Sequence, residues 1–260
     1  MKVAFFIHED YDFSFGLLQA VLPAILKKHQ VTGIVSFPDV LTGYTGMQIP
    51  LKYLELFGFR TTARMAVRSI LNRMALFTGY LRGRNGGYTF GQLARKYGIP
   101  CRACPSPNHP DLVQWVRATQ TDIIFIFIGH ILEREILAAP ACCVINKHAS
   151  LLPSNRGVLP VFWAMLSGER IGFSLHTVIE KLDSGKVVYQ KEYEDLNLTL
   201  YEWYRKIYAD VPQAILSCLD QYPWDGRTPA RGHPDAVPSY HGLPTKEDVK
   251  RFYARGLRII

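Results

Sequence analysis

Three polar residues of this sequence have types and spacings that suit acyl transfer to an amine. Asn146 and His148 follow an apolar run and stand two residues apart, a spacing that directs both side chains to one face in extended backbone. Asp183 lies between two strand-like segments, in a stretch typical of a turn. An amide and an imidazole can stabilise an oxyanion, and a carboxylate can orient or charge the imidazole and move protons. We therefore predict that Asn146, His148 and Asp183 form a catalytic trio.

The apolar segments that must position this trio predict an α/β fold. A strand at 2–7, a helix at 15–28 and a strand at 31–37 follow one another, as in a parallel βαβ unit. Periodicity also predicts strands at 122–128, 142–145 and 185–193 and helices at 89–97, 111–119 and 200–219, with a last short helix capped by Thr245 and Asp248. We expect a doubly wound, Rossmann-like, mostly parallel sheet, with the trio at its carboxyl edge.

Residues 1–200 are expected to form the catalytic domain, with a helical insertion at about residues 51–84. Residues 201–260 are expected to form a C-terminal helix and a Pro/Gly-rich extension, and residues 222–244 should be extended or coiled.

The insertion combines apolar and basic residues in a way that suits one or two amphipathic helices. A helix that packs its apolar face on the domain and leaves its arginines in water is the ordinary interpretation. A more specific interpretation is a basic amphipathic surface that approaches a membrane or an anionic partner. Contact with a second subunit and an effect on substrate choice are further alternatives. The apolar residues are Leu54, Phe57, Met65, Val67, Ile70, Leu71, Met74 and Phe77, and the basic ones are Arg60, Arg64, Arg68, Arg73, Arg82 and Arg84.

Composition indicates an ordinary globular protein that favours anionic partners. The 260 residues carry a net charge of +8, which suits nucleotides, nucleic acid or a membrane surface without choosing among them. No stretch reaches the roughly 20 apolar residues of a membrane span. The apolar run at the N-terminus is too short for a signal peptide, so a cytoplasmic location is expected.

The five cysteines do not suggest a disulfide framework in a chain of this length. Cys101 and Cys104 have CxxC spacing, but they lie in a Pro-rich loop and no second ligand pair at zinc spacing accompanies them. We interpret them as ordinary thiols, with redox chemistry as the alternative, and expect no metal.

Two spaced motifs resemble those of the folate-dependent formyltransferase family. That family carries Asn-x-His-x-x-Leu-Leu-Pro-x-x-x-Gly and then Leu-Asp-x-Gly, and the segment 173–176 stands where it commonly has Val-Thr-Ile/Leu-His. The resemblance covers roughly residues 1–200 and is densest over 122–193. The matching residues are Asn146, His148, Leu151, Leu152, Pro153 and Gly157, then Leu182, Asp183 and Gly185.

The resemblance implies that 10-formyltetrahydrofolate donates the formyl group. It implies that the substrate amine attacks the formyl carbon, that Asn146 and a protonated His148 hold the oxyanion, and that Asp183 keeps His148 charged. Lys147 departs from the family's usual apolar residue, and alternation should turn it away from the site. By the same resemblance the residues beside the folate are Ile128, Gly129, His130, Ile131 and Leu132, with Glu180 and Leu182 closing over its other side.

The acceptor implied by the resemblance is a small amine, with the sugar N-formyltransferase branch as the nearest match. A nucleotide-linked amino sugar would suit the basic charge, with Arg156, Trp163 and Tyr189 as its expected neighbours. About 60 residues follow residue 200, too few for the tRNA-binding C-terminal domain of methionyl-tRNA formyltransferase, so tRNA is not expected. An activity like that of methionyl-tRNA formyltransferase, a formyltetrahydrofolate hydrolase and a non-catalytic binder remain the alternatives.

Overall fold

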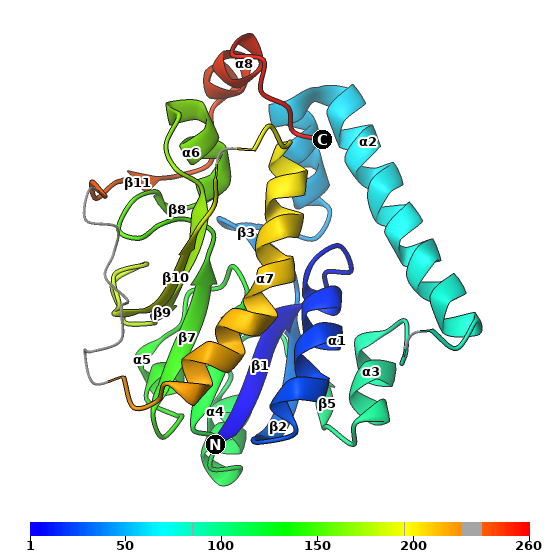
Figure 1. Cartoon of the computed structure of the whole chain (residues 1–260), viewed down its shortest axis with the longest axis vertical. Coiled ribbons are helices and arrows are strands. Elements are labelled where there is room, and N and C mark those ends of the chain that lie inside the picture. Colours follow the sequence, from blue (N-terminus) through cyan, green and yellow to red (C-terminus); the bar gives the residue numbers. More distant parts are fainter. Residues whose placement is uncertain (85, 195, 225–235) are drawn as a thin grey trace. The chain divides into compact units, whose positions relative to one another are not determined.

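The computed structural model describes residues 1–84, 86–194, 196–224 and 236–260. Seven strands pair in the order β10-β9-β7-β6-β1-β2-β5, and Figure 1 labels the strands and helices along the chain. Contacts divide the chain into two compact units: unit 1 comprises residues 1–40 and 66–145, and unit 2 comprises residues 41–65 and 146–260. The predicted α/β fold with a mostly parallel, Rossmann-like sheet is confirmed.

Unit 1 is the parallel part of the sheet with its helices. β1 pairs in parallel with β2 and with β6, and β2 pairs in parallel with β5. All five residues of β6 are buried, as expected for a central strand covered on both faces. The elements are β1 (Lys2–His8), α1 (Ser14–Ile25), β2 (Gln30–Phe37), α3 (Phe90–Lys96), β5 (Cys101–Ala103), α4 (Pro110–Ala118), β6 (Ile123–Phe127), α5 (Arg134–Leu137) and the start of β7 (Cys143–His148).

Unit 2 holds the end of β7 and an antiparallel pair of strands. β9 and β10 run antiparallel, with Leu175 opposite Tyr189. α7 and α8 both begin with a capping box, so the predicted caps at Thr245 and Asp248 are confirmed. The elements are β4 (Tyr44–Thr45), β8 (Arg156–Gly157), α6 (Pro160–Ser167), β9 (Gly172–Thr177), β10 (Val187–Glu192), α7 (Leu200–Asp220), β11 (Tyr240–His241) and α8 (Lys246–Ala254), while the short β3 (Val40–Leu41) lies at the junction of the units.

The insertion forms α2 (Gln48–Leu81), a helix interrupted at Gly58. Gly58 has a φ of 76° and a ψ of 168°, a conformation that only glycine adopts at low cost. Leu56 and Phe57 are the buried residues of α2, whereas most apolar residues from Val67 onward are exposed and Leu76 is half-buried. The expectation that the helix packs its apolar face on the domain is therefore wrong for this second half, because a helix of this length presents more apolar surface than its contacts cover.

Two further expectations concern the cysteines and the stretch 222–244. Cys101–Ala103 forms β5, paired with β2 at Ile34↔Cys101, although the sequence indicated a loop; a three-residue edge strand is too short to show an alternating pattern. None of the five cysteines forms a disulfide. Of the stretch 222–244, residues 225–235 lie outside the described residues.

Among the described residues, no helix combines the length and the apolar character needed to cross a membrane.

Candidate functional site

Asn146 and His148 lie at the carboxyl end of β7, within unit 2. His148 is buried, at 5% exposed, and Asn146 is half-buried. Between them, Lys147 places its ammonium 4.2 Å from the ring centroid of Tyr208 on α7. The alternation of the strand thus sends Lys147 to the opposite face, as predicted.

A backbone carbonyl fixes the tautomer of His148. Its Nε2 lies 2.8 Å from the carbonyl oxygen of Asn155, which can only accept, so Nε2–H is the donor. The lone pair of the neutral ring is therefore on Nδ1, and this atom faces Oδ1 of Asp183 at 3.7 Å. Asn155 is itself buried with a φ of 53°, and its amide donates to Glu169 over 2.7 Å.

Asp183 occupies the turn between β9 and β10 that the sequence predicted. Its φ of 46° is left-handed, a region that Asp tolerates better than most residues. The backbone N–H of Gly157 donates to Oδ2 of Asp183 over 2.9 Å. A Cβ on Gly185 would lie 1.6 Å from the carbonyl oxygen of Thr177, so glycine is required for this turn to close and to present the carboxylate.

His176 joins the trio as a fourth member that the sequence analysis did not assign to the site. Its Nδ1 lies 3.0 Å from the carbonyl oxygen of Thr177 and its Nε2 lies 3.2 Å from Nδ2 of Asn146. The Nδ1–H therefore donates to the backbone and Nε2 accepts from the amide. Nε2 also lies 3.6 Å from Oδ1 of Asp183. The available signal was alternation along β9, which gives the buried Ser174 and His176 one common face.

Burial and neighbouring groups have opposite effects on the pKa values of Asp183 and His148. Burial raises the pKa of Asp183, but His176, the positive charge that His148 can carry and the Gly157 N–H outweigh it and lower the pKa to about 2. Burial lowers the pKa of His148, and the attraction of Asp183 offsets only part of that effect. Burial thus favours the neutral form of the His148 imidazole beside an ionised Asp183 carboxylate, whereas the resemblance implied a protonated imidazole, so the protonation state of His148 stays a prediction.

The three residues expected near the acceptor are placed differently from one another. Arg156 donates from Nη1 to the hydroxyl of Ser184 over 3.0 Å, next to Asp183. Trp163 stacks on His241, with ring centroids 4.5 Å apart. Tyr189 stacks on Phe173, and alternation along β9 puts Phe173 on the face opposite to His176. The structure therefore brings Arg156 to the trio and leaves Tyr189 on the other face.

The residues expected to contact the folate lie in two places. Glu180 and Leu182, in unit 2, are exposed in the loop that precedes Asp183. The segment 128–132 follows β6 and belongs to unit 1. It presents Ile131, which is 68% exposed, and the buried Leu132.

Gly129 and His130 give this segment a defined shape. A Cβ on Gly129 would lie 2.4 Å from the carbonyl oxygen of Val40, and its N–H donates to Nε2 of His8 over 2.7 Å. Nδ1 of His130 is buried without a hydrogen-bond partner in the part of the chain that the structure describes. A flat heteroaromatic ring with polar edges fits such a segment, since it could pair with that nitrogen and pack on Ile131.

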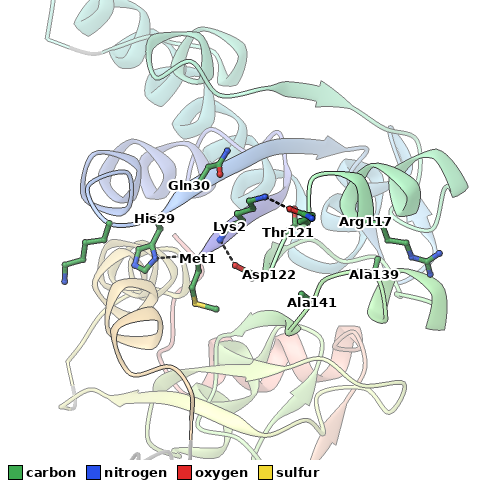
Figure 2. Close-up of a pocket in the computed structure, with 11 residues that line it drawn as sticks. Met1, Lys2, His29, Gln30, Arg117, Thr121, Asp122, Ala139 and Ala141 are labelled. Carbon is green, nitrogen blue, oxygen red and sulfur yellow. Dashed lines mark hydrogen bonds between the residues drawn. The ribbon is translucent and has the colours of Figure 1, made fainter.

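Unit 1 carries hollows at both edges of its strands. At the amino edge, a recess of about 780 Å³ is lined by Met1, Lys2, His29 and Asp122 among others (Figure 2). At the carboxyl ends of β1, β2 and β5, a smaller hollow of about 460 Å³ has a mixed lining that includes the polar residues Glu9, Ser36 and Asp39. The carboxyl edge is where open α/β sheets bind ligands, so we give the smaller hollow more weight. No group of three His, Cys, Asp or Glu side chains among the described residues is arranged to hold a metal ion.

A protein-family model matches the middle of the chain. Residues 93–217 match the model of the family described as formyl transferase. This range includes the end of β7, the turn at Asp183 and the whole of β9 and β10.

Solved structures share the fold at low sequence identity. A phosphoribosylglycinamide formyltransferase from Bacillus halodurans has a TM-score of 0.58 and 16% identity and covers 89% of this chain and 100% of its own. A glycinamide ribonucleotide transformylase from Symbiobacterium toebii has a TM-score of 0.56 and 16% identity, covering 84% and 85%. A sugar N-formyltransferase from Shewanella sp. has a TM-score of 0.55 and 13% identity, covering 98% and 87%.

Proposed function

Because this chain is an enzyme of the folate-dependent formyltransferase family, which uses 10-formyltetrahydrofolate as formyl donor, we propose that it formylates the primary amine of a nucleotide-linked amino sugar. One observation carries the assignment of the catalytic residues. The buried carboxylate of Asp183 lies within 3.7 Å of His148 and 3.6 Å of His176, and His176 in turn contacts Asn146.

The donor is assigned to residues of the 128–132 segment and of the loop before Asp183. When bound, it supplies a formyl group whose oxygen gains negative charge as the amine attacks. The orphaned Nδ1 of His130 and the exposed Ile131 support a role in holding the pterin ring. Glu180 and Leu182 are exposed, and we assign them to the other side of the donor.

Asn146 is the residue that we assign to the formyl oxygen. One N–H of its amide donates to Nε2 of His176, which fixes the plane of the amide before any substrate binds. The second N–H of the same group then serves as a preorganised donor to the developing oxyanion. Such donors act strongly because no reorganisation is needed during the reaction.

His148 and Asp183 are assigned to the proton. Neutral His148 takes a proton from the attacking amine at Nδ1, the atom that carries its lone pair, and later gives it to the nitrogen that leaves. Asp183 stays ionised and stabilises the imidazolium across 3.7 Å. The backbone carbonyl of Asn155 holds the ring in position throughout. No covalent enzyme intermediate is required.

Two side chains, those of Arg156 and Trp163, support the choice of acceptor. Arg156 lies beside the turn of Asp183 and uses its Nε and Nη1 in bonds to Ser239 and Ser184. A guanidinium has five donors, so others are left for a phosphate, and Trp163 offers an aromatic surface. The sugar N-formyltransferase from Shewanella shares the fold over 98% of this chain, which agrees with a small acceptor.

An acceptor screen tests this proposal. Purified protein and 10-formyltetrahydrofolate are incubated with a panel of amino-sugar nucleotides, glycinamide ribonucleotide and methionyl-tRNA, and products are identified by mass spectrometry. We expect a product heavier by one formyl group with an amino-sugar nucleotide. Formylation of another acceptor alone, or release of formate without any acceptor, would contradict the proposed substrate class.

The protonation state of His148 gives a second, independent prediction. Because burial lowers its pKa, the imidazole should titrate below pH 6.5, with the neutral ring protonated on Nε2. In Asp183→Asn the pKa should fall further, because the carboxylate that favours the charged ring is gone. NMR titration of protein with 15N-labelled imidazoles measures both the pKa and the tautomer, and His148→Gln assigns the signal.

A titration above pH 6.5, or an upward shift in Asp183→Asn, would show that the proton relay is wrongly assigned.

A further inference from the structure

The second half of α2, cyan in Figure 1, carries an apolar stripe of exposed side chains. Its residues recur at alternating intervals of three and four, which places them along one side of a helix. Each is between 42% and 66% exposed, and together they extend for about 21 Å at the rise of an α-helix. We call this the α2 stripe: Val67, Ile70, Leu71, Met74, Phe77 and Leu81.

Contacts on the other face of the helix determine which side is left outside. Ser69, Asn72 and Leu76 are half-buried at intervals of three and four, and the amide of Asn72 donates to the carboxylate of Asp12. The guanidinium of Arg73 lies 4.1 Å from the ring centroid of Tyr11. These contacts fix the rotation of the helix within unit 1, so the α2 stripe cannot turn inward without breaking them.

From Arg60 onward, all charged residues of α2 are basic. Between Glu55 and Asp111 the sequence contains no Asp or Glu. The six arginines from Arg60 to Arg84 account for six of the eight net positive charges, and all are exposed. Arg68 follows Val67 directly and Arg82 follows Leu81 directly, so an arginine adjoins each end of the stripe.

The arginines beside the α2 stripe distinguish between two partners that could cover it, a second copy of the chain and an anionic lipid surface. A second copy of the chain, packed stripe to stripe, would bring together two arginine-rich helix segments that carry no carboxylate from Arg60 onward, and like charges opposed in this way are destabilising. An anionic lipid surface meets both features at once, because its acyl region accepts the apolar side chains and its phosphates pair with the arginines. Charge complementarity therefore favours the lipid surface.

We propose that the α2 stripe and its arginines form a docking surface for an anionic lipid bilayer, on which the helix lies in the plane of the interface. This surface is separate from the formyl-transfer residues, since none of those belongs to α2. Binding needs both components: the apolar stripe, which enters the boundary between headgroups and acyl chains, and the arginines, which select anionic lipids and make binding weaker at high salt.

Co-sedimentation of the full chain with lipid vesicles tests the proposal. Wild-type protein should bind vesicles of phosphatidylcholine mixed with phosphatidylglycerol, should not bind phosphatidylcholine alone, and should be released by high salt. Ile70→Ser with Met74→Ser, and separately Arg82→Glu with Arg84→Glu, should each weaken binding by roughly tenfold or more. Because all four side chains are exposed, these variants should fold, and circular dichroism checks that they do.

Matched controls change the same properties elsewhere. Arg95→Glu with Arg117→Glu makes the same charge change on α3 and α4, and Met47→Ser with Val237→Ser removes two other exposed apolar side chains. These controls should bind as the wild type does. Absence of wild-type binding, or equal loss in the controls, would overturn the proposal. A wild-type dimer that Ile70→Ser with Met74→Ser converts to a monomer in analytical ultracentrifugation would assign the stripe to a second copy.

Discussion

Replacing Asp183 with Asn should lower kcat by roughly two to four orders of magnitude, the range expected when a group that assists proton transfer is lost. The substitution removes the charge and little else. Asn also tolerates left-handed backbone, and its side-chain oxygen can still accept the N–H of Gly157. The imidazolium formed at His148 would then face a neutral amide, so its formation costs more free energy. Binding of 10-formyltetrahydrofolate should change little.

Steady-state kinetics with the acceptor from the screen, and calorimetric titration with the donor, measure the two effects. Asp210→Asn is the matched control, because Asp210 is another unit 2 carboxylate, bonded to Lys191 and Tyr193 outside the cluster. It should leave kcat near the wild-type value. If Asp183→Asn turned over at nearly the normal rate, the carboxylate would have no part in the chemistry.

His148→Gln should reduce kcat by a similar factor, roughly two to four orders of magnitude. Glutamine can still donate to the carbonyl of Asn155, so the buried acceptor keeps a partner, but it has no basic nitrogen to take the amine proton. His148→Ala should lose the same activity and also some stability, about 1–3 kcal/mol, because the Asn155 carbonyl is then left unpaired.

Kinetics and urea unfolding of the two variants separate chemistry from stability. His109→Gln, at a half-buried histidine of unit 1 outside the cluster, is the control and should match the wild type in kcat. Retention of activity in His148→Gln, with loss only in His148→Ala, would mean that the ring serves as a hydrogen-bond donor and not as a base.

Sequence alone was sufficient for the fold class and for most of the elements. The central strand β6 is an uninterrupted apolar run, and helices such as α7 and α8 begin with capping residues that can be recognised in the sequence. Both signals are local, because they depend on the period of burial and on backbone groups within one turn. The three-residue β5 was missed since its identity depends on pairing with β2, which no local pattern records.

For the site, sequence determined the residue types at Asn146, His148 and Asp183, through the spacing on β7 and the turn motif that ends in Gly185. Only the tertiary structure added His176, because its approach to Asn146 depends on the register of a neighbouring strand. It also places His148 in a buried environment that lowers its pKa, since burial is a property of the packed environment and not of the residue.

The same division holds for α2. Its helical character and its arginines could be predicted from composition and periodicity, whereas the direction of its apolar face could not. A stripe at helical spacing has the same sequence whether it is buried or exposed. The contacts of Asn72 and Arg73 on the inner face settle that the stripe from Val67 to Leu81 is exposed, because rotation of a helix is set by what it packs against.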